Sequence, residues 1–273
     1  MASSSSGPDP SMETAACFRR VQQSQYYVDT NMDNRLGRGS SGTVVQGYFG
    51  ERANTLAAKI FTVLDEKEFT DPPEHEATVL KRLRHENIIK VYDVLRERVR
   101  IAGEPHVNIW IMMEYCPLGD LVRYCRETDL NLRQKVQIML ECANGLSHLH
   151  DIKRLTHRDV KPQNVLMGGS MQSPVAKLSD FGTAKYLEYN ERDKTRSVHS
   201  LAGTDSYMAP ELHSLSFDDQ EPTYDKSVDV FSLGMTYLSL IGAKAGTRMT
   251  PYLGEECFGQ YNKMISLQSR YRM

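Results

Sequence analysis

The sequence predicts an α+β fold of two lobes, in which a small strand-rich lobe precedes a larger helical one. Runs of β-forming residues, bounded by Gly, Pro or Asn, dominate from Asn34 to about Glu114. From Gly119 onward, apolar residues recur mostly at helical spacing. Of the 273 residues, 40% are hydrophobic and 25% are charged. This is an ordinary globular composition, and the chain is long enough to bury a core without disulfides.

The strand-rich lobe is expected to hold several strands and one main helix. Its clearest β-rich runs are Thr43–Val45, Leu56–Phe61 and Asn108–Met113. Four residues between the second and third runs lie at helical spacing: Glu76, Leu80, Leu83 and Asn87. The first 24 residues are rich in Ser, Gly and Pro, so we expect a disordered tail there. The expected domains are a tail over residues 1–24, a first lobe over 25–116 and a second lobe over 117–273.

Two helices stand out in the second lobe. The first is marked by residues that repeat at steps of four, three and three, namely Val136, Leu140, Ala143 and Leu146. The second is the most apolar stretch of the chain, from Val228 to Ala243, which contains Asp229. It is shorter than the ~20 residues that a membrane span needs. We therefore expect a buried helix there and no membrane span.

Charge and cysteine content exclude several classes of protein. Lys and Arg number 33 against 35 Asp and Glu, a net charge of -2, so a nucleic-acid partner is not expected. The N-terminus lacks the apolar segment of a signal peptide. No two cysteines fall at CxxC spacing, which indicates neither a zinc site nor a disulfide framework. A reducing compartment, the cytoplasm or also the nucleus, is expected. The cysteines are Cys17, Cys116, Cys125, Cys142 and Cys257.

A glycine-rich segment opens the first lobe. Leu36–Val44 fits the pattern G-x-G-x-x-G-x-V, with glycines at Gly37, Gly39 and Gly42. Glycines let a tight hairpin approach phosphates closely and present backbone N–H donors. A hairpin without a ligand explains the pattern equally well. A Rossmann site is disfavoured, because the last glycine leads into β-branched residues and not into a helix.

A lysine and a glutamate follow the glycines. Lys59 lies inside an apolar strand, where an ammonium group is costly unless it finds a counter-charge. Glu76 shares a helix face with Leu80 and Leu83, so its carboxylate points toward the core side and is the available partner. The alternatives are an edge lysine that reaches water and a solvated helix glutamate.

The second lobe carries the most specific motif. His157–Leu166 matches H-R-D-x-K-P-x-N. In this spacing Asp159 can accept or orient a hydroxyl proton, Lys161 can neutralise a transferring phosphate, and Asn164 can bind Mg²⁺. Asp180, in the tripeptide D-F-G, supplies a second hard oxygen ligand suited to Mg²⁺. The segment Gly203–Glu211 follows and contains A-P-E.

Six motifs in this order resemble the eukaryotic protein kinase family, over Asn34 to Ala243. The resemblance implies a bilobal kinase-like fold, with an N-lobe and a C-lobe, and the cofactors ATP and Mg²⁺. Gly37, Gly39 and Gly42 would cover the phosphates, and Lys59 would hold them and pair with Glu76. Asn164 and Asp180 would bind the metal. Asp159 would orient the substrate hydroxyl, and Lys161 would offset charge on the γ-phosphate.

The resemblance also implies an adenine and ribose site. Backbone groups near Glu114 and Cys116 would bind the adenine, behind Met113 as the gatekeeper residue. Val44, Ala57 and Leu166 would sandwich the ring, and Asp120 would reach the ribose. Leu36, beside the glycines, completes this cofactor-binding set. Leu80, His157 and Phe181 would form part of the hydrophobic spine of the active core.

The acceptor class and its regulation follow from a few positions. Lys161 and Pro162 are typical of kinases that act on Ser or Thr, and Thr204 resembles the residue that contacts the catalytic Asp and Lys in them. The substrate would therefore be a protein with a Ser or Thr acceptor. Arg158 implies a basic pocket for a phosphate on Ser200, or on Ser197 as the second candidate. An upstream kinase or self-association would place that phosphate.

The subfamily is suggested by three segments, which resemble the IκB-kinase-related group: Met113–Pro117, Ser200–Thr204 and Phe217–Pro222.

The match to the family departs from the pattern at its end. Only residues 244–273 follow Ala243, whereas a complete kinase C-lobe has several further helices, so the C-lobe is predicted to be truncated after the helix that contains Asp229. One helical candidate lies around residues 257–271. Two alternatives stay open at this point. The chain is an active Ser/Thr kinase, or it is a truncated kinase-like ATP-binding or regulatory module without robust catalysis.

Overall fold

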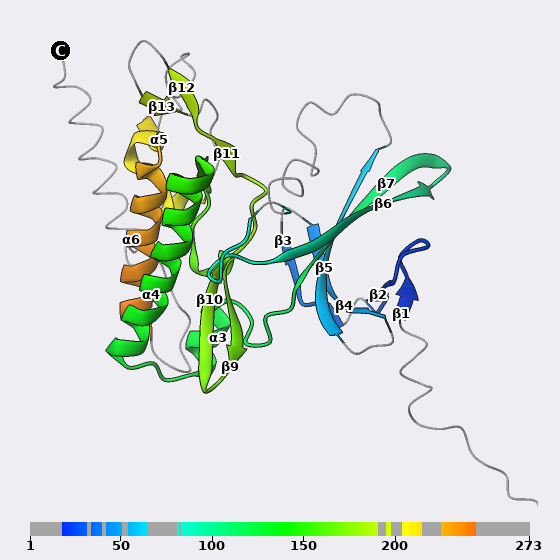
Figure 1. Ribbon diagram of the computed structural model, residues 1–273, viewed down its shortest axis with the longest axis horizontal. Coiled ribbons are helices and arrows are strands. Elements are labelled where there is room, and N and C mark those ends of the chain that lie inside the picture. Colours follow the sequence, from blue (N-terminus) through cyan, green and yellow to red (C-terminus); the bar gives the residue numbers. More distant parts are fainter. Residues whose placement is uncertain are drawn as a thin grey trace, which may run out of the picture. The chain divides into compact units, whose positions relative to one another are not determined.

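The computed structural model describes residues 18–31, 34–39, 42–50, 54–64, 81, 83–190, 195–197, 204–214 and 225–243. The chain divides into two compact units (Figure 1). Unit 1 comprises residues 1–82 and 90–115, and unit 2 comprises residues 83–89 and 116–273. The boundary therefore falls between Tyr115 and Cys116, one residue before the predicted one. The short segment Leu83–Ile89 belongs to the second unit.

Unit 1 is an antiparallel sheet in the order β1-β2-β4-β5-β7-β6, with β3 paired to β4. The three strand-forming runs fall in β4, β5 and β7, as predicted. The strands are β1 Phe18–Arg20, β2 Tyr26–Asp29, β3 Gly37–Gly39, β4 Gly42–Phe49, β5 Asn54–Leu64, β6 Val91–Ile101 and β7 Glu104–Glu114.

The predicted helix between β5 and β6 is wrong at its C-terminal end. Leu83 and Asn87 fit the helical spacing but lie in a loop. Both are buried, and the Asn87 side chain donates to the carbonyl of Ala176 at 3.1 Å, so tertiary contacts in unit 2 explain these positions. Glu76 and Leu80 lie outside the described residues.

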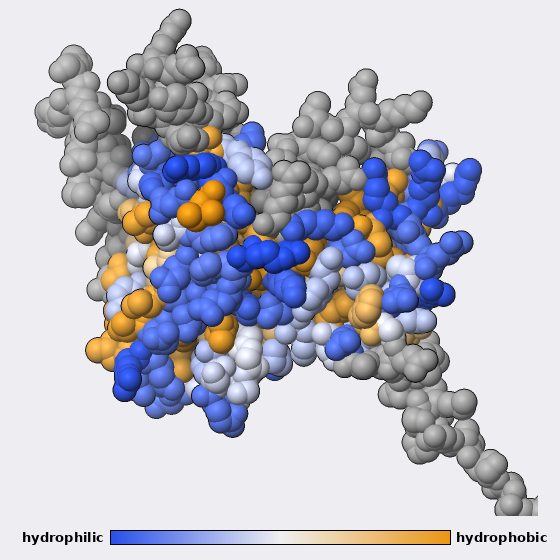
Figure 2. All heavy atoms as spheres, viewed as in Figure 1, coloured by the Kyte–Doolittle hydropathy of each residue, from blue (hydrophilic) through white to orange (hydrophobic). Residues whose placement is uncertain are grey.

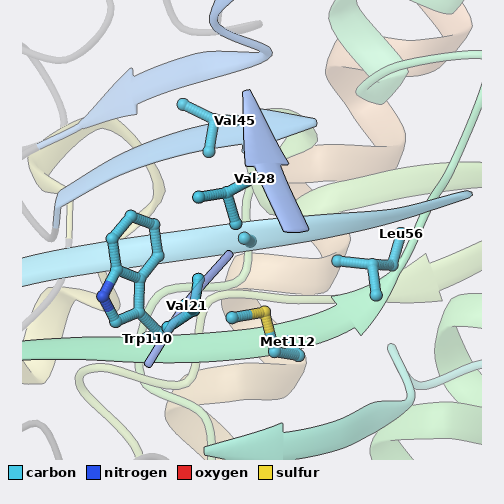
Figure 3. Close-up of a cluster of buried hydrophobic side chains, with 7 residues drawn as sticks. Val21, Val28, Val45, Leu56, Trp110 and Met112 are labelled. Atoms are coloured by element: carbon cyan, nitrogen blue, oxygen red, sulfur yellow. The ribbon is translucent and has the colours of Figure 1, made fainter. Parts of the chain in front are cut away.

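The core of unit 1 lies on one face of the sheet. It is built by Val21, Val28, Val45, Leu56, Ala58, Trp110 and Met112 (Figure 3). Val45, Ala58 and Met112 face one another across β4, β5 and β7. Because side chains alternate along a strand, the residues on either side of these three point to the opposite face of the sheet.

The disordered tail predicted over residues 1–24 is wrong from Phe18 onward, where β1 pairs with β2. Arg19 donates two hydrogen bonds to the Glu97 carboxylate, at 2.7 and 2.8 Å, and its guanidinium lies 5.2 Å from the centre of the Trp110 ring. Val21 is fully buried. This anchor needs a partner 78 positions away, which local composition does not show.

Changing Glu97 to Gln is expected to remove a pH-dependent part of the stability of unit 1. The hydrogen bond from Arg19 holds the pKa of the Glu97 carboxyl at about 2, below its ordinary value of 4.5. The carboxylate therefore stabilises the fold above about pH 4.5, and this contribution is lost as the pH falls toward about 2.

Free energies of unfolding in urea, measured from neutral to acidic pH, test this prediction. The difference between the parent and the Glu97→Gln variant should be constant near neutrality and narrow below about pH 4.5. A difference that stays the same over the whole range would contradict it.

In its described residues, unit 2 combines helices with three small two-stranded sheets, β8–β11, β9–β10 and β12–β13. Its helices are α3 Leu121–Glu127, α4 Leu132–Ser147, α5 Pro210–Ser214 and α6 Ser227–Gly242. Its strands are β8 Leu155–Thr156, β9 Val165–Ser170, β10 Ser173–Leu178, β11 Lys185–Tyr186, β12 Glu188–Asn190 and β13 Thr195–Ser197. A π-helical turn, His148–Lys153, continues α4, and short 3₁₀ turns cover Pro162–Asn164 and Asp205–Tyr207.

Helices α4 and α6 pack side by side (Figure 1). α4 begins at a capping box, in which the Asn131 side chain accepts from the amide of Gln134 and the Gln134 side chain accepts in return. α6 matches the predicted buried helix to within one residue at each end. The ammonium of Lys135 on α4 donates to the carbonyls of Ile241 and Ala243, at 3.0 and 2.7 Å, and so fixes the end of α6.

The apolar spacing identified α4 but not its buried side. Val136, Leu140 and Ala143 are exposed, and of the four marked residues only Leu146 is buried. The side packed into the unit carries Ile138, Met139 and Cys142 instead. Across the described residues, each helix is too short or too polar to cross a membrane.

Candidate active site

Four side chains of unit 2 form one hydrogen-bonded cluster. The Thr204 hydroxyl donates to Asp159 Oδ1 at 2.6 Å and accepts from Lys161 Nζ at 2.6 Å. Lys161 Nζ also donates to Asp159 Oδ2 at 2.7 Å. The Asn164 amide donates to the same oxygen at 2.9 Å and to the Asp159 carbonyl at 2.8 Å. The structure therefore brings together all four residues that the sequence singled out in two separate motifs.

The loop that carries Asp159, Lys161 and Asn164 is anchored by a residue of α6. Asp229, which has no exposed surface, accepts the amide of His157 at 2.8 Å on Oδ2 and the amide of Arg158 at 2.7 Å on Oδ1. The His150 ring lies 2.7 Å from Oδ2. Arg158 has a positive φ of 70°, a conformation that costs energy in a residue with a Cβ. Asp229 holds the backbone in that conformation by binding the Arg158 amide and the one before it.

His150 is a member of the site that sequence reasoning missed. It lies in the π-helical turn after α4, and such turns often occur at functional sites. Its partner Asp229 is 79 positions away, so no local pattern reveals the pair.

Asp180 is connected to Asn164 through the residue before it, Ser179. The amide and the hydroxyl of Ser179 donate to the Asn164 carbonyl at 2.9 and 3.0 Å. Asp180 has a φ of 59°, and the next residue, Phe181, places its ring 4.7 Å from that of His157. The expected spine contact between these two rings is present, whereas Leu80 lies outside the described residues.

The donor set of unit 2 fits Mg²⁺. Asp180 and Asn164 offer a carboxylate and an amide oxygen from adjacent segments, and both are hard ligands. Mg²⁺ usually takes one or two protein ligands and completes its shell with water and phosphate oxygens. A metal site built from protein ligands alone would need a cluster of at least three His, Cys, Asp or Glu side chains. The described residues contain no such cluster.

In unit 1, the residues expected around a nucleotide share one face of the sheet. Val44 lies opposite Lys59, and Ala57 lies opposite Met113. All four alternate with the core residues of Figure 3 and so point away from that core. Lys59 is 7% exposed, and its ammonium lies 4.8 Å from the centre of the Phe61 ring.

The glycine-rich segment forms the hairpin of β3 and β4, in which Gly39 pairs with Gly42. Gly42 has a φ of 118°, and a Cβ there would lie 2.5 Å from the Ile60 carbonyl oxygen. The fold itself therefore requires this glycine. A Cβ on Gly37 would meet no atom within 4 Å, so packing does not explain that glycine. The Leu36 amide donates to the Val44 carbonyl at 2.8 Å, while its side chain is 43% exposed.

The expected adenine and ribose residues are divided between the units. In unit 1 the Glu114 amide donates to the Lys90 carbonyl at 2.9 Å. In unit 2, Asp120 forms a β-bridge with Leu166. The Asp120 side chain also accepts the Arg123 amide at 2.8 Å and so caps α3, a structural role that sequence reasoning missed. Cys116 is buried in unit 2 and accepts the Gly119 amide at its carbonyl, at 3.2 Å.

The residues expected to take part in regulation are only partly described by the structure. Arg158 is 8% exposed, and its Nε donates to the Thr183 carbonyl. Ser197 lies in β13 opposite Glu188 of β12. Ser200 and Gly203 lie outside the described residues, as does Glu76.

Comparison with known proteins identifies the family of the chain. The family model described as the protein kinase domain matches residues 30–256. The chain is 33% identical over 224 residues to the serine/threonine-protein kinase atg1 of Dictyostelium discoideum, covering 80% of this chain and 31% of that protein. It is 31% identical over 222 residues to the serine/threonine-protein kinase VIK of Arabidopsis thaliana, covering 80% and 47%.

A third relative is the inhibitor of nuclear factor kappa-B kinase subunit epsilon of Mus musculus. The identity is 29% over 215 residues, covering 75% of this chain and 28% of that protein. The chain thus spans less than half the length of each of these three relatives.

Proposed function

Because the chain belongs to the protein kinase domain family, we propose that it is a protein serine/threonine kinase, which transfers the γ-phosphate of ATP to a protein hydroxyl. The observation that carries the proposal is the cluster of Asp159, Lys161, Asn164 and Thr204. Each of these groups has a fixed position before any substrate binds, which is what phosphoryl transfer requires of a protein. The relatives with serine/threonine kinase names support the same acceptor class.

Asp159 orients the acceptor hydroxyl in this mechanism. An ionised carboxylate offers about four acceptor positions. Thr204, Lys161 and Asn164 occupy three of them, one on Oδ1 and two on Oδ2. The remaining position on Oδ1 accepts the hydroxyl proton of the substrate and aims its oxygen for attack.

Lys161 balances the charge of the transferred group. Its ammonium has three N–H donors. Asp159 and Thr204 take two of them. The third is left for an oxygen of the γ-phosphate, so the lysine joins the acceptor-orienting carboxylate to the phosphate being transferred.

Asn164 and Asp180 would hold Mg²⁺, and Lys59 with Gly37, Gly39 and Gly42 would hold the nucleotide phosphates. When bound, Mg·ATP supplies the activated phosphoryl group and neutralises its developing charge. The side-chain amide nitrogen of Asn164 donates to two oxygens of Asp159. The side-chain oxygen of Asn164 is then the atom suited to bind a cation.

The proposal extends to regulation and location. Phosphorylation of Ser200 or Ser197 by an upstream kinase or a second copy would switch activity, with Arg158 as a candidate phosphate-binding residue. The resemblance to the IκB-kinase-related group is supported by one relative of that name. Three described cysteines are buried thiols, which agrees with a cytoplasmic or nuclear location: Cys116, Cys125 and Cys142. A non-catalytic module is not favoured, because the catalytic cluster is assembled.

The acceptor class can be tested by incubating the full chain with labelled ATP, Mg²⁺ and a peptide mixture that contains Ser, Thr and Tyr acceptors. Partial acid hydrolysis then releases the phosphoamino acids, and their separation identifies the labelled one. We expect label on phosphoserine or phosphothreonine, with none when EDTA replaces Mg²⁺. Label mainly on phosphotyrosine would overturn the acceptor class.

Replacing Thr204 with Val is expected to lower kcat by roughly 10–100-fold and to leave KM for ATP nearly unchanged. The variant keeps the shape of the side chain but loses the hydroxyl that joins Asp159 to Lys161. Thr204→Ser should restore most of the rate, because it restores the hydroxyl. Steady-state kinetics measure both variants, and an equal loss in both would show that Thr204 acts by packing instead.

A further inference from the structure

Unit 1 contains a cavity of about 390 Å³ at the edge of its sheet. Its described lining residues are Gln22 in the turn between β1 and β2, Arg96 and Arg98 of β6, and Val107 of β7. Val107 is buried and lies opposite Arg98, so it gives the cavity an apolar wall. The volume is in the range of sites that bind small ligands. These four residues belong neither to the Asp159 cluster nor to the expected nucleotide site, so the proposed activity does not explain the cavity.

The charge of the cavity comes from β6. Arg96 and Arg98 are two positions apart, so their side chains leave the strand on the same side. Both are exposed, and Figure 2 shows hydrophilic surface, in blue, around the β6–β7 hairpin at the right of the view. A guanidinium is always ionised, and its N–H donors fit two oxygens of a phosphate at once. Two of these groups beside one cavity therefore favour an anion with several oxygens.

The carboxylate between the two arginines belongs to a different contact. Glu97 alternates with them along β6, so its side chain points to the opposite side of the strand. There it accepts two hydrogen bonds from Arg19 and one, at 3.0 Å, from the indole N–H of Trp110. None of the described lining residues of the cavity is a carboxylate. An anion in the cavity is therefore not repelled by any of these residues.

The turn that carries Gln22 is held beside β6. Arg19 ties β1 to Glu97, and Val21 is fully buried in the core of unit 1. The Ser24 amide donates to the Val21 carbonyl at 3.2 Å and closes the turn. Gln22 has a φ of 52°, a conformation that costs energy in a residue with a Cβ and that often occurs where a ligand is held. Its side-chain amide adds N–H donors to those of the two arginines.

The edge of β6 indicates what carries the anion. In the described part of unit 1, β6 is the last strand of the sheet and pairs only with β7. An edge strand presents N–H and C=O groups to which an extended peptide can add as a further strand. Directly opposite residues on neighbouring strands have their Cβ atoms about 5 Å apart. A phosphorylated Ser or Thr on such a peptide would therefore bring its phosphate within reach of Arg96 and Arg98.

We propose that this cavity binds the phosphate of a phosphorylated Ser or Thr in an extended peptide that adds to the edge of β6. Arg96 and Arg98 hold the phosphate oxygens by charge-assisted hydrogen bonds, and Gln22 donates to them from the turn. The backbone of β6 binds the backbone of the peptide. The site recognises a peptide and transfers no phosphate, so its test is independent of the proposed activity.

Binding can be measured by fluorescence anisotropy with the full chain, in the absence of ATP and Mg²⁺. The probe is a labelled peptide library with one central phosphoserine, and the same library with serine is the reference. We expect the phosphorylated library to bind about tenfold more tightly or better. Equal affinities would overturn the proposal. Displacement by inorganic phosphate as effective as that by the unlabelled phosphorylated library would also overturn it, because the anion alone would then be the ligand.

Replacing both Arg96 and Arg98 with Gln is expected to weaken binding of the phosphorylated library about tenfold. Arg100→Gln is the matched control, because Arg100 lies in the same row on β6 but outside the described lining, and it donates to the Gly103 carbonyl at 3.3 Å. It should change the Kd less than about twofold. Equal losses in the two variants would show a general attraction to a basic strand and would overturn the assignment to the cavity. Urea unfolding checks that each variant is folded, and Arg98→Gln alone replaces the double variant should that one fold poorly.

A second measurement tests the addition of the peptide to the sheet. We expect amide hydrogen exchange in β6 to slow about tenfold with a saturating amount of the phosphorylated library and to stay at the parent rate with the serine library. Unchanged exchange in β6 while the phosphorylated library is bound would contradict the addition to this strand.

Discussion

Changing Asp159 to Asn is expected to slow phosphate transfer by roughly 10²–10⁴-fold. The side chain keeps its size, but an amide has a single acceptor oxygen and adds an N–H donor. In the parent, both carboxylate oxygens accept, Oδ1 from Thr204 and Oδ2 from Lys161 and Asn164. If the amide nitrogen takes the place of Oδ2, its N–H groups face the donors of Lys161 and Asn164. If it takes the place of Oδ1, the substrate hydroxyl loses its acceptor.

The affinity for Mg·ATP should change little in this variant, because Asp159 is assigned to the acceptor hydroxyl and not to the metal. Steady-state rates and nucleotide titrations measure the two effects separately. Gln163→Ala is the matched control, since Gln163 is an exposed residue of the same loop and should transfer at nearly the parent rate. A parent-like rate in Asp159→Asn would rule out the assigned role.

Changing Asp229 to Asn is expected to lower the free energy of unfolding by about 3 kcal/mol, since it removes a buried charge that three groups share. Oδ2 accepts the His157 amide and faces His150, and Oδ1 accepts the Arg158 amide. One of the two backbone donors must then face an N–H of the new amide, whichever way it turns. The loop that carries Asp159 loses its anchor, so under the proposed function the transfer rate should fall with the stability.

Urea unfolding measures the stability, and hydrogen exchange of residues 155–160 reports on the loop. Thr236→Val is the matched control on α6. It removes a buried hydroxyl whose bond is to the Ser232 carbonyl of the same helix, so its cost should be about 1 kcal/mol. If Asp229→Asn cost no more than Thr236→Val and kept its activity, the anchor would be unimportant.

The sequence predicted the site residues better than their supports. Asp159, Lys161 and Asn164 lie within six residues, and chemistry at such short spacing is visible in a motif. Thr204 was predicted through the resemblance, and its contacts with Asp159 and Lys161 are present. His150 could not be found in this way, because its partner Asp229 is 79 positions away in the sequence. The two residues meet only in the folded chain, where His150 lies in the π-helical turn after α4.

Two errors in the predicted fold have related physical causes. The tail prediction relied on local composition, whereas β1 is held by Arg19 through Glu97, far along the chain. The helical spacing on α4 found a true helix, but the marked residues Val136 and Leu140 lie on its exposed side. Periodicity shows that apolar residues share a face, and it does not show which neighbour covers that face.

The central claim is that the clustered residues of unit 2 catalyse transfer and do more than bind nucleotide. One sample of the full chain, with calorimetric titration of Mg·ATP followed by measurement of labelled γ-phosphate on a Ser or Thr peptide, tests it most directly. We predict saturable binding together with transfer that requires Mg²⁺. Saturable binding with no transfer to the peptide or to the chain itself would contradict the claim.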